Sequence, residues 1–417
     1  MPRIPTRTIP ALADVTKDIS GPLPVGLLDD WAASPDRSHA AARLLLAPYR
    51  REGTVVSSDT AGLTRMTQER ELLDVLWLVS EPMQILYAVG TAIGGHSIGV
   101  WEADNTEMLY PPQLSADAIV DAMLEAQARI AERTKVKVGI CVHTGVFYEI
   151  GGGLFGGDAQ LAEELAENHA AGAEILVTDA LVQRLQASRE YTLTRRADLD
   201  ALYAPGTFSL RSERRMAALR EVVAPYPHPF PTEFFAMLGD PALRAATSAA
   251  TQGAGAHMIE RFVVFLARKG AASSQENLAS VLDELLLNEQ LNDVVSANLG
   301  GSATLAETTG GLCIVVFENG REAVDFARAV RERFREQSLL VSVGIDRGPV
   351  LLFPKGSGRV GTIAGDPINL SSKISEDLGE AGRIRITARA AEGVLGLDGA
   401  ERFEAMISGV QIRGFIL

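Results

Sequence analysis

The sequence predicts an α+β fold built twice, each copy being an antiparallel sheet covered by helices. Two observations predict it. First, residues 156–180 (GGDAQLAEELAENHAAGAEILVTDA) and 365–390 (GDPINLSSKISEDLGEAGRIRITARA) share one pattern: glycine, polar turn, amphipathic helix, glycine linker and β-branched strand. Second, the expected order around each is β-α-α-β-β-α-β, then α-β. A repeat of this length indicates two domains able to pack as a pseudo-dimer.

Apolar periodicity gives each copy the same elements in the same order. In the first copy they are the strand TVVSSD, a helix over 68–92, a hairpin over 95–110, a helix over 115–133 and the strand VKVGICV. In the second they are the strand RFVVFLA, a helix over 277–299, a hairpin over 300–317, a helix over 321–334 and the strand LLVSVGI. The glycine-rich loop EIGGGLFGG lacks the lysine of a phosphate-binding loop and is interpreted as a turn.

Four segments follow from these patterns. Residues 1–50 form an N-terminal extension with one helix, at about 36–50. Residues 51–210 form the first copy and residues 258–417 the second. Residues 211–257 form a linker, because proline-dense sequence followed by a run of alanine, glycine and serine marks a boundary.

Composition excludes several classes of partner. The formal net charge is −14 over 417 residues, which argues against nucleic acid or an anionic membrane surface. The apolar stretch from Leu72 to Ile93 is broken by Asp74, Glu81 and Pro82, so no membrane span is expected. The N-terminus lacks the apolar core of a signal peptide, so we expect a cytoplasmic protein.

The first strand of copy one ends in a candidate site. Asp59 ends an apolar strand and precedes a small-residue turn into a helix, so its carboxylate can bind a hard cation. The turn amides can face a phosphate. They belong to Ala61, Gly62, Leu63 and Thr64. Asp104, in the following hairpin, can supply a second carboxylate to the cation pair. The alternatives are that Asp59 caps the helix and that Asp104 forms a turn.

These motifs carry a resemblance. The motifs follow one another in a fixed order: strand-Asp-x-x-Gly-x-Thr, Gly-Gly, a hairpin turn, Gly-Ile-x-x-Gly, and Gly-Asp-x-x-Asn-x-x-x-Arg/Lys. In this order they resemble the class III nucleotidyl cyclase catalytic domain, over residues 50–205 and 258–417. The resemblance implies two ferredoxin-like-type cyclase homology domains that meet head to tail. It implies a metal-dependent reaction in which the ribose 3′-oxygen attacks the α-phosphorus and pyrophosphate leaves.

The resemblance divides the roles between the copies. Asp59 and Asp104 fall at the positions that hold two Mg²⁺ or Mn²⁺ ions, whereas copy two has Ala267 and Gly311 there. The expected Gly-Asp of the hairpin is Ala103-Asp104, so the register of Asp104 is open. Copy one is thus the metal-holding half, and copy two is degenerate at these positions.

The partner positions show the reverse. Asn369 falls at the ribose position and Lys373 at the transition-state position, where lysine replaces the usual arginine. Copy one carries Gln160 and Glu164 there, and a glutamate repels a triphosphate. The resemblance therefore implies a single interdomain site.

The choice of base stays open. Glu307 at the first base-reading position resembles guanine readers, whereas Thr362 at the second occurs in some adenine readers. The alternative is that Glu307 is a solvated strand residue. The expected ligand is accordingly ATP or GTP.

Two functions remain open at this stage. One is a nucleotidyl cyclase that makes a cyclic purine mononucleotide. The other is a catalytically inactive pseudo-cyclase that senses nucleotides or binds a regulatory protein. The expected assembly is a monomer with an intramolecular pseudo-dimer, or a higher homo-oligomer. His143 is expected to be structural.

Overall fold

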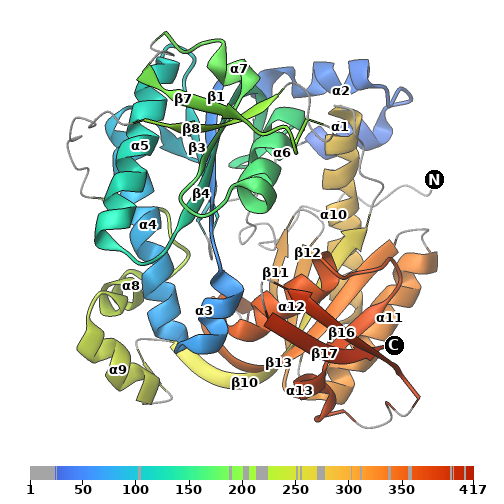
Figure 1. Ribbon diagram of the computed structural model, residues 1–417. Coiled ribbons are helices and arrows are strands. Elements are labelled where there is room, and N and C mark those ends of the chain that lie inside the picture. Colours follow the sequence, from blue (N-terminus) through green and yellow to red (C-terminus); the bar gives the residue numbers. More distant parts are fainter. Residues whose placement is uncertain are drawn as a thin grey trace.

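The protein consists of two halves, each built around one sheet. In Figure 1 the half formed by the earlier part of the sequence lies at the top and the other half lies at the bottom. This computed structural model describes residues 24–417 except 25, 102–104, 187–189, 201–205, 213–223, 250–251, 254–255, 270–277, 302, 310–311, 337–339, 356–358, 395–396, 398 and 408–409. The strands of the first sheet come from copy one of the repeat. Those of the second sheet come from copy two and from the residues just before it, starting at Gln252.

The first sheet has the strand order β2-β3-β1-β4-β6-β8-β7, and β5 pairs with β4. Its strands are β1 (Arg50–Thr60), β2 (His96–Ser97), β3 (Thr106–Tyr110), β4 (Val138–Ile150), β5 (Gly153–Phe155), β6 (Ile175–Thr178), β7 (Thr192–Arg195) and β8 (Thr207–Arg211). The long β1 and β4 lie at its centre and pair over eleven residues of β1.

The second sheet repeats this order as β11-β12-β10-β13-β15-β17-β16, with β14 on β13 and β9 on β10. Its strands are β9 (Gln252–Gly253), β10 (Ala256–Lys269), β11 (Thr304–Thr309), β12 (Leu312–Phe317), β13 (Leu340–Lys355), β14 (Arg359–Ala364), β15 (Ile384–Thr387), β16 (Glu401–Ile407) and β17 (Val410–Ile416). The predicted α+β fold in two copies is therefore confirmed.

The sheets are mixed rather than purely antiparallel, which corrects one detail of the prediction. β4 and β6 run parallel in the first sheet, and β13 and β15 run parallel in the second. In each case a helix connects the two strands, and a helical crossover returns the chain to the same end of the sheet.

Helices cover both faces of each sheet. α4 (Leu72–Ala92) and α5 (Ala116–Arg133) cover one face of the first sheet, and α10 (Leu278–Asn298) and α11 (Gly320–Glu336) cover the equivalent face of the second. The crossover helices α6 (Gly157–Glu164) and α12 (Asp366–Glu376) pack on the opposite faces. The other helical segments are α1 (Leu27–Ala33), α2 (His39–Leu46), η2 (Ala47–Tyr49), α3 (Leu63–Glu69), η3 (Leu165–His169), α7 (Asp179–Val182), α8 (Thr232–Leu238), α9 (Pro241–Ala249) and α13 (Ala388–Ala391).

Two expectations about helices need correction. The helix expected over 68–92 is two helices, α3 and α4, because Arg70 and Glu71 between them have extended backbones. The extension before β1 contains a second helix, α1, in addition to the expected one. The glycine-rich loop is a turn as predicted, and Gly151 and Gly152 at its tip both have positive φ.

Each copy is preceded by helices that reach across to the other copy. In Figure 1 the first pair, α1 and α2, lies beside α10, and the second pair, α8 and α9, lies beside α4. The α1–α2 pair shares a buried cluster with the end of β4 and with α10. The α8 helix shares one with β13 and α4. We call these helix pairs the first and second arms.

Each arm therefore packs against the long strand of its own copy and the long helix of the other. Trp31 of the first arm is fully buried, and its indole N–H donates to Asp283 of α10 at 2.8 Å. Phe234 of the second arm is also fully buried and lies edge-on to Phe353 of β13, with ring centroids 4.6 Å apart. The two halves are thus joined by apolar contacts at two related places.

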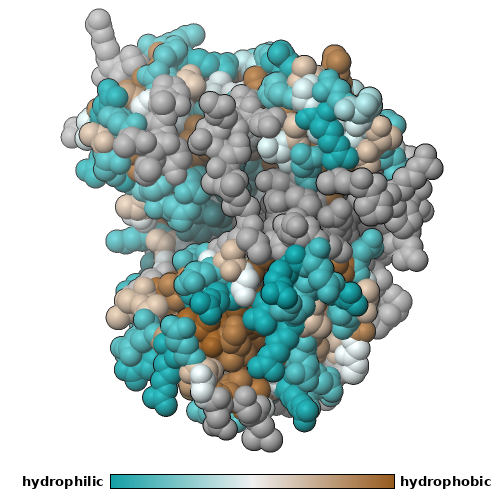
Figure 2. Space-filling model, turned by 90° about the vertical axis from the view of Figure 1, so that its right-hand side faces the viewer, coloured by the Kyte–Doolittle hydropathy of each residue, from teal (hydrophilic) through white to brown (hydrophobic). Residues whose placement is uncertain are grey.

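By length and composition, α4 is the one helix in the described part of the chain that could cross a membrane. Most of it is buried inside the protein, where it forms part of the core of the first half. Figure 2 shows one face of the molecule, on which hydrophilic residues predominate and a hydrophobic area lies on the lower half.

Candidate nucleotide site between the two halves

The structure places Asp59 at the end of β1, near the start of β3, which is the second strand of the predicted hairpin. Asp59 is half-buried and lies opposite Gly139 of β4. β3 begins at Thr106, which pairs with Ser58, one residue before Asp59. The hydroxyls of Ser58 and Thr106 are 2.5 Å apart. The hairpin thus returns to the end of β1 as the sequence predicted. Asp104 itself lies outside the described residues.

The turn after Asp59 differs in part from its predicted use. The amide N–H of Ala61 donates to the carbonyl of Lys137 at 2.9 Å. The prediction of a free amide at Ala61 is therefore wrong, because the turn is tied to the start of β4. Gly62 has a φ of 83° and is the N-cap of α3, which begins at Leu63. Thr64, in the first turn of α3, is buried.

Copy two has an apolar residue at the position of Asp59. Ala267 lies opposite Ser342 of β13, as Asp59 lies opposite Gly139 of β4. The side chain of Ala267 is buried and offers no oxygen to a cation. Gly311 lies outside the described residues.

The helix α12 carries the two residues predicted to contact ribose and phosphate. Asn369 and Lys373 are four residues apart, so they occupy one face of the helix. The side-chain nitrogen of Asn369 is buried and has no hydrogen-bond partner among the described residues. The ammonium of Lys373 is half-exposed and lies 3.7 Å from the carboxylate of Asp377, one turn further along α12.

The matching helix of copy one, α6, carries an acidic residue where α12 carries the basic Lys373. Gly156 is the N-cap of α6 and Gly365 is the N-cap of α12, so Gln160 occupies the place of Asn369. Gln160 is exposed. Glu164, in the place of Lys373, lies 3.8 Å from the Nε2 atom of His169.

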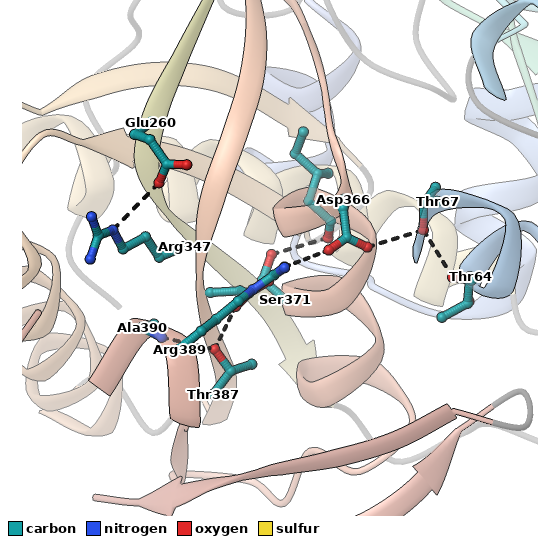
Figure 3. Close-up of polar contacts among 11 residues, drawn as sticks. Thr64, Thr67, Glu260, Arg347, Asp366, Ser371, Thr387, Arg389 and Ala390 are labelled. Carbon is teal, nitrogen blue, oxygen red and sulfur yellow. Dashed lines mark hydrogen bonds and ion pairs between the residues drawn. The ribbon is translucent and has the colours of Figure 1, made fainter. Parts of the chain in front are cut away.

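The two halves of the predicted site meet. α3, which follows Asp59 in copy one, packs against α12 of copy two. The hydroxyl of Thr67 in α3 donates to the carboxylate of Asp366 in α12 at 3.0 Å, as Figure 3 shows. This contact therefore joins the helix that follows Asp59 to the helix that carries Asn369.

The elements that carry the two base-reading candidates are also neighbours. Glu307 lies on β11, just after a bulge in its pairing with β12. Thr362 lies on β14, opposite Phe353 of β13. β11 and β14 contact one another, so these strands bring the two sequence-distant positions to one region of copy two.

Sequence reasoning missed a buried polar network beneath α12. Asp346 of β13 is fully buried and accepts hydrogen bonds from Thr387 and Arg389. Arg389 also donates to Asp366 at 2.6 Å. Burial raises the pKa of the Asp346 carboxyl, and the hydrogen bond and charge of Arg389 oppose that rise. The available signal was an aspartate inside the otherwise apolar strand LLVSVGID.

The equivalent strand position in copy one is His143, which the sequence predicted to be structural. Its Nδ1 atom lies 2.8 Å from the Thr178 hydroxyl, and its Nε2 atom lies 3.0 Å from an Asp158 oxygen. The other Asp158 oxygen accepts from the amide of Val146 at 2.6 Å. Every one of these contacts lies inside copy one, which supports a structural role.

The residues present suit hard cations only in part. The Asp59 carboxylate is a ligand that Mg²⁺ prefers, and Mg²⁺ commonly takes one or two protein carboxylates together with substrate phosphates. Within the described parts of the chain, no group of three or more His, Cys, Asp or Glu side chains is arranged to hold a metal. Of the two predicted metal ligands, Asp59 alone lies within the described residues.

The fold of this chain resembles that of several solved structures. The structure is similar to a class III adenylyl cyclase-like ATP-binding protein from Pseudomonas aeruginosa, with 14% sequence identity and a TM-score of 0.52. The match covers 86% of this chain and 93% of that one. It is also similar to the adenylyl cyclase CyaB from P. aeruginosa, with 15% identity, a TM-score of 0.35, and coverage of 40% of this chain and 98% of that one.

A third similarity is to the guanylyl cyclase Cya2, with 18% identity, a TM-score of 0.34, and coverage of 39% of this chain and 93% of that one. No protein-family model matches the sequence, and no curated protein matches it. The fold and the two-copy topology define a class III adenylyl/guanylyl cyclase-like fold in a tandem arrangement.

Proposed function

We propose that this protein binds a purine nucleoside triphosphate with divalent cations at one site between its two copies and cyclises it. The products are the 3′,5′-cyclic monophosphate and pyrophosphate. The observation that carries the proposal is the packing of α3 against α12. It joins the helix that follows Asp59 to the helix that carries Asn369. The related positions of the opposite copies hold Ala267 and Gln160.

In this proposal the residues of the two copies have separate roles. Asp59 holds the cations, which when bound acidify the ribose 3′-hydroxyl and neutralise the phosphate oxygens. The buried amide nitrogen of Asn369 orients the ribose through a hydrogen bond. Lys373 supplies positive charge to the phosphate at which the 3′-oxygen attacks. Since Lys373 has a single ammonium, it gives this charge without the two-point grip of arginine.

A second candidate function is nucleotide binding without turnover. It is favoured by the position of Lys373, whose ammonium lies near Asp377 of its own helix. It also agrees with the similar protein from P. aeruginosa, which is described as cyclase-like and ATP-binding. A protein of this kind signals the presence of a nucleotide to a regulatory partner.

The decisive experiment measures binding and turnover on the same full-length protein. Calorimetry with non-hydrolysable analogues of ATP and GTP in Mg²⁺ gives the affinity, and incubation with each triphosphate and Mn²⁺ gives cyclic product and pyrophosphate. We expect Asp59→Asn and Asn369→Ala to reduce turnover by about 100-fold, the scale on which loss of one transition-state contact is felt.

Gln160→Ala is the matched control, because it alters the related position of the other copy. Its turnover should equal that of the unaltered protein. Tight binding with no cyclic product from either triphosphate would favour the second candidate. Absence of both binding and product would overturn the proposal, as would equal losses in Gln160→Ala and Asn369→Ala.

A further inference from the structure

A chain of polar contacts runs from the core of copy two to the surface of copy one. Asp346, fully buried, accepts hydrogen bonds from the Thr387 hydroxyl at 2.5 Å and from Arg389 Nε at 2.8 Å. Arg389 Nη2 donates to one oxygen of Asp366 at 2.6 Å. The other Asp366 oxygen lies 3.0 Å from the Thr67 hydroxyl of α3, whose single proton is shared with the Thr64 carbonyl at 2.9 Å. Figure 3 shows Arg389, Asp366 and Thr67 in line between the two copies.

Asp346, at the buried end of these contacts, determines how the Arg389 side chain is oriented. A carboxylate without solvent is costly unless it is paired and hydrogen-bonded, so Asp346 must hold the guanidinium. Arg389 donates to Asp346 through Nε and Nη2. Because Nη2 carries two protons, it also donates to Asp366. Arg389 is therefore held in place by Asp346, and it orients Asp366, the first residue of α12.

The other end of this chain of contacts lies beside the candidate site. Asp366 begins α12, and Asn369 follows it within the same helical turn. Thr67 lies on α3, which begins four residues after Asp59. The link from Arg389 through Asp366 thus joins the two elements that must keep a fixed separation for Asp59 and Asn369 to share one ligand.

Among the described residues, copy one carries different side chains at the places of Arg389 and Asp346. Its residue at the place of Arg389, the second residue of the helix after the parallel strand, is Ala180. His143 takes the place of Asp346, and Asp158 near the start of α6 is bonded to His143 and to the Val146 amide. The acidic group of copy one is thus satisfied within its own half. The acidic group of copy two reaches across the interface that carries Asp59.

We propose that Arg389 is a positioning residue for the interdomain site. Held by Asp346, it orients Asp366 towards Thr67 and so fixes Asn369 relative to the turn after Asp59. This inference rests on the proposed nucleotide site for its functional consequence, whereas the link between the halves stands on the contacts themselves.

The test uses two variants of the full-length protein that break different parts of the chain. Thr67→Val removes the donor on α3 without disturbing Asp346, and Arg389→Lys keeps the charge but loses the second nitrogen. Thr192→Val, on the exposed edge strand β7, is the matched control. Circular dichroism and thermal unfolding establish that each variant is folded.

Two measurements are made on each variant. Amide hydrogen exchange at α3 and the first turn of α12 reports the link directly and needs no nucleotide. We expect Thr67→Val and Arg389→Lys to speed it roughly three- to tenfold, the effect of losing one hydrogen bond. Affinity for a non-hydrolysable ATP or GTP analogue with Mg²⁺ should fall by a similar factor, with both readings unchanged in Thr192→Val.

The outcomes separate this inference from the proposed function. Unchanged exchange in both variants overturns the link, whatever the protein binds. Faster exchange with unaltered nucleotide affinity overturns the positioning role while leaving the nucleotide site intact. If the unaltered protein binds neither analogue, the proposed function fails and the positioning role fails with it. Faster exchange together with weaker affinity at an unaltered unfolding temperature supports both.

Discussion

At the residue scale, the two copies differ in how they use one buried position on their central strands. Copy one places His143 there, between Thr178 and Asp158. Copy two places Asp346 there and pairs it with Arg389. Both solutions obey the rule that buried polar groups need partners. Only the second leaves an acidic residue, Asp366, that is bonded to the other copy.

The first prediction concerns Asp158. Burial raises the pKa of its carboxyl, but hydrogen bonds from His143 and the Val146 amide outweigh burial and hold the pKa below its ordinary value. A depressed pKa in the folded state stabilises the protein above the unfolded-state pKa, and that stability is lost as the pH falls through the folded value. Asp158→Asn should therefore lower the free energy of unfolding by about 1 kcal/mol at neutral pH.

This deficit should shrink as the pH falls below about 4, where the carboxyl of the unfolded chain takes up a proton, and it should vanish below the lower pKa of the folded carboxyl. Thermal unfolding between neutral and acidic pH measures it. Asp29→Asn, at an exposed position on α1, is the control and should show no comparable deficit. A deficit of the same size at all pH values would contradict the assigned role of the Asp158 charge.

At the element scale, the arms determine how the halves are held together. Each arm packs against the long strand of its own copy and the long helix of the other. Seven-residue helices such as α1 and α8 have little stability by themselves, so this packing is what keeps them folded. The arms therefore stabilise the interface, and the interface stabilises the arms.

The second arm gives a direct test. Phe234 is fully buried between α4 and β13, so Phe234→Ala should leave a cavity and cost about 3–5 kcal/mol of stability. Urea denaturation measures the loss. Leu243→Ala on α9, where half of the side chain is exposed, should change stability by no more than about 0.5 kcal/mol. Equal effects of the two substitutions would contradict the bridging role of α8.

At the scale of the whole molecule, two sheets of the same topology form one cross-braced unit. The first arm ties copy one to α10, the second ties copy two to α4, and α3 packs against α12 between them. Contacts at three places make the unfolding of one half costly for the other. The halves should therefore unfold together.

Differential scanning calorimetry of the full-length protein should accordingly show one transition. Trp31→Ala removes a fully buried side chain and its hydrogen bond to Asp283, and should weaken the coupling between the halves. We expect that variant to show a lower and broader transition. Two well-separated transitions in the unaltered protein would mean that the arms do not couple the halves.

The repeated pattern of helix and strand residues determined much of the fold. Apolar runs predicted β1 and β4, and the two copies of the glycine-helix-strand pattern predicted the matching halves. The parallel pairing of β4 with β6 was not visible, because strand direction depends on where the connecting helix crosses the sheet. In the arms, the sequence predicted α2 but not α1, α8 or α9, because such short helices depend on distant contacts.

The candidate site divides in the same way. The sequence by itself predicted which residues of each copy would carry chemistry: Asp59 against Ala267, and Asn369 against Gln160. Only the tertiary structure showed that the Ala61 amide donates a hydrogen bond to the Lys137 carbonyl. Only the tertiary structure showed that Arg389 links Asp346 to Asp366. The physical reason is that side-chain type is local, whereas a hydrogen bond between residues far apart in the chain exists only once the chain has folded.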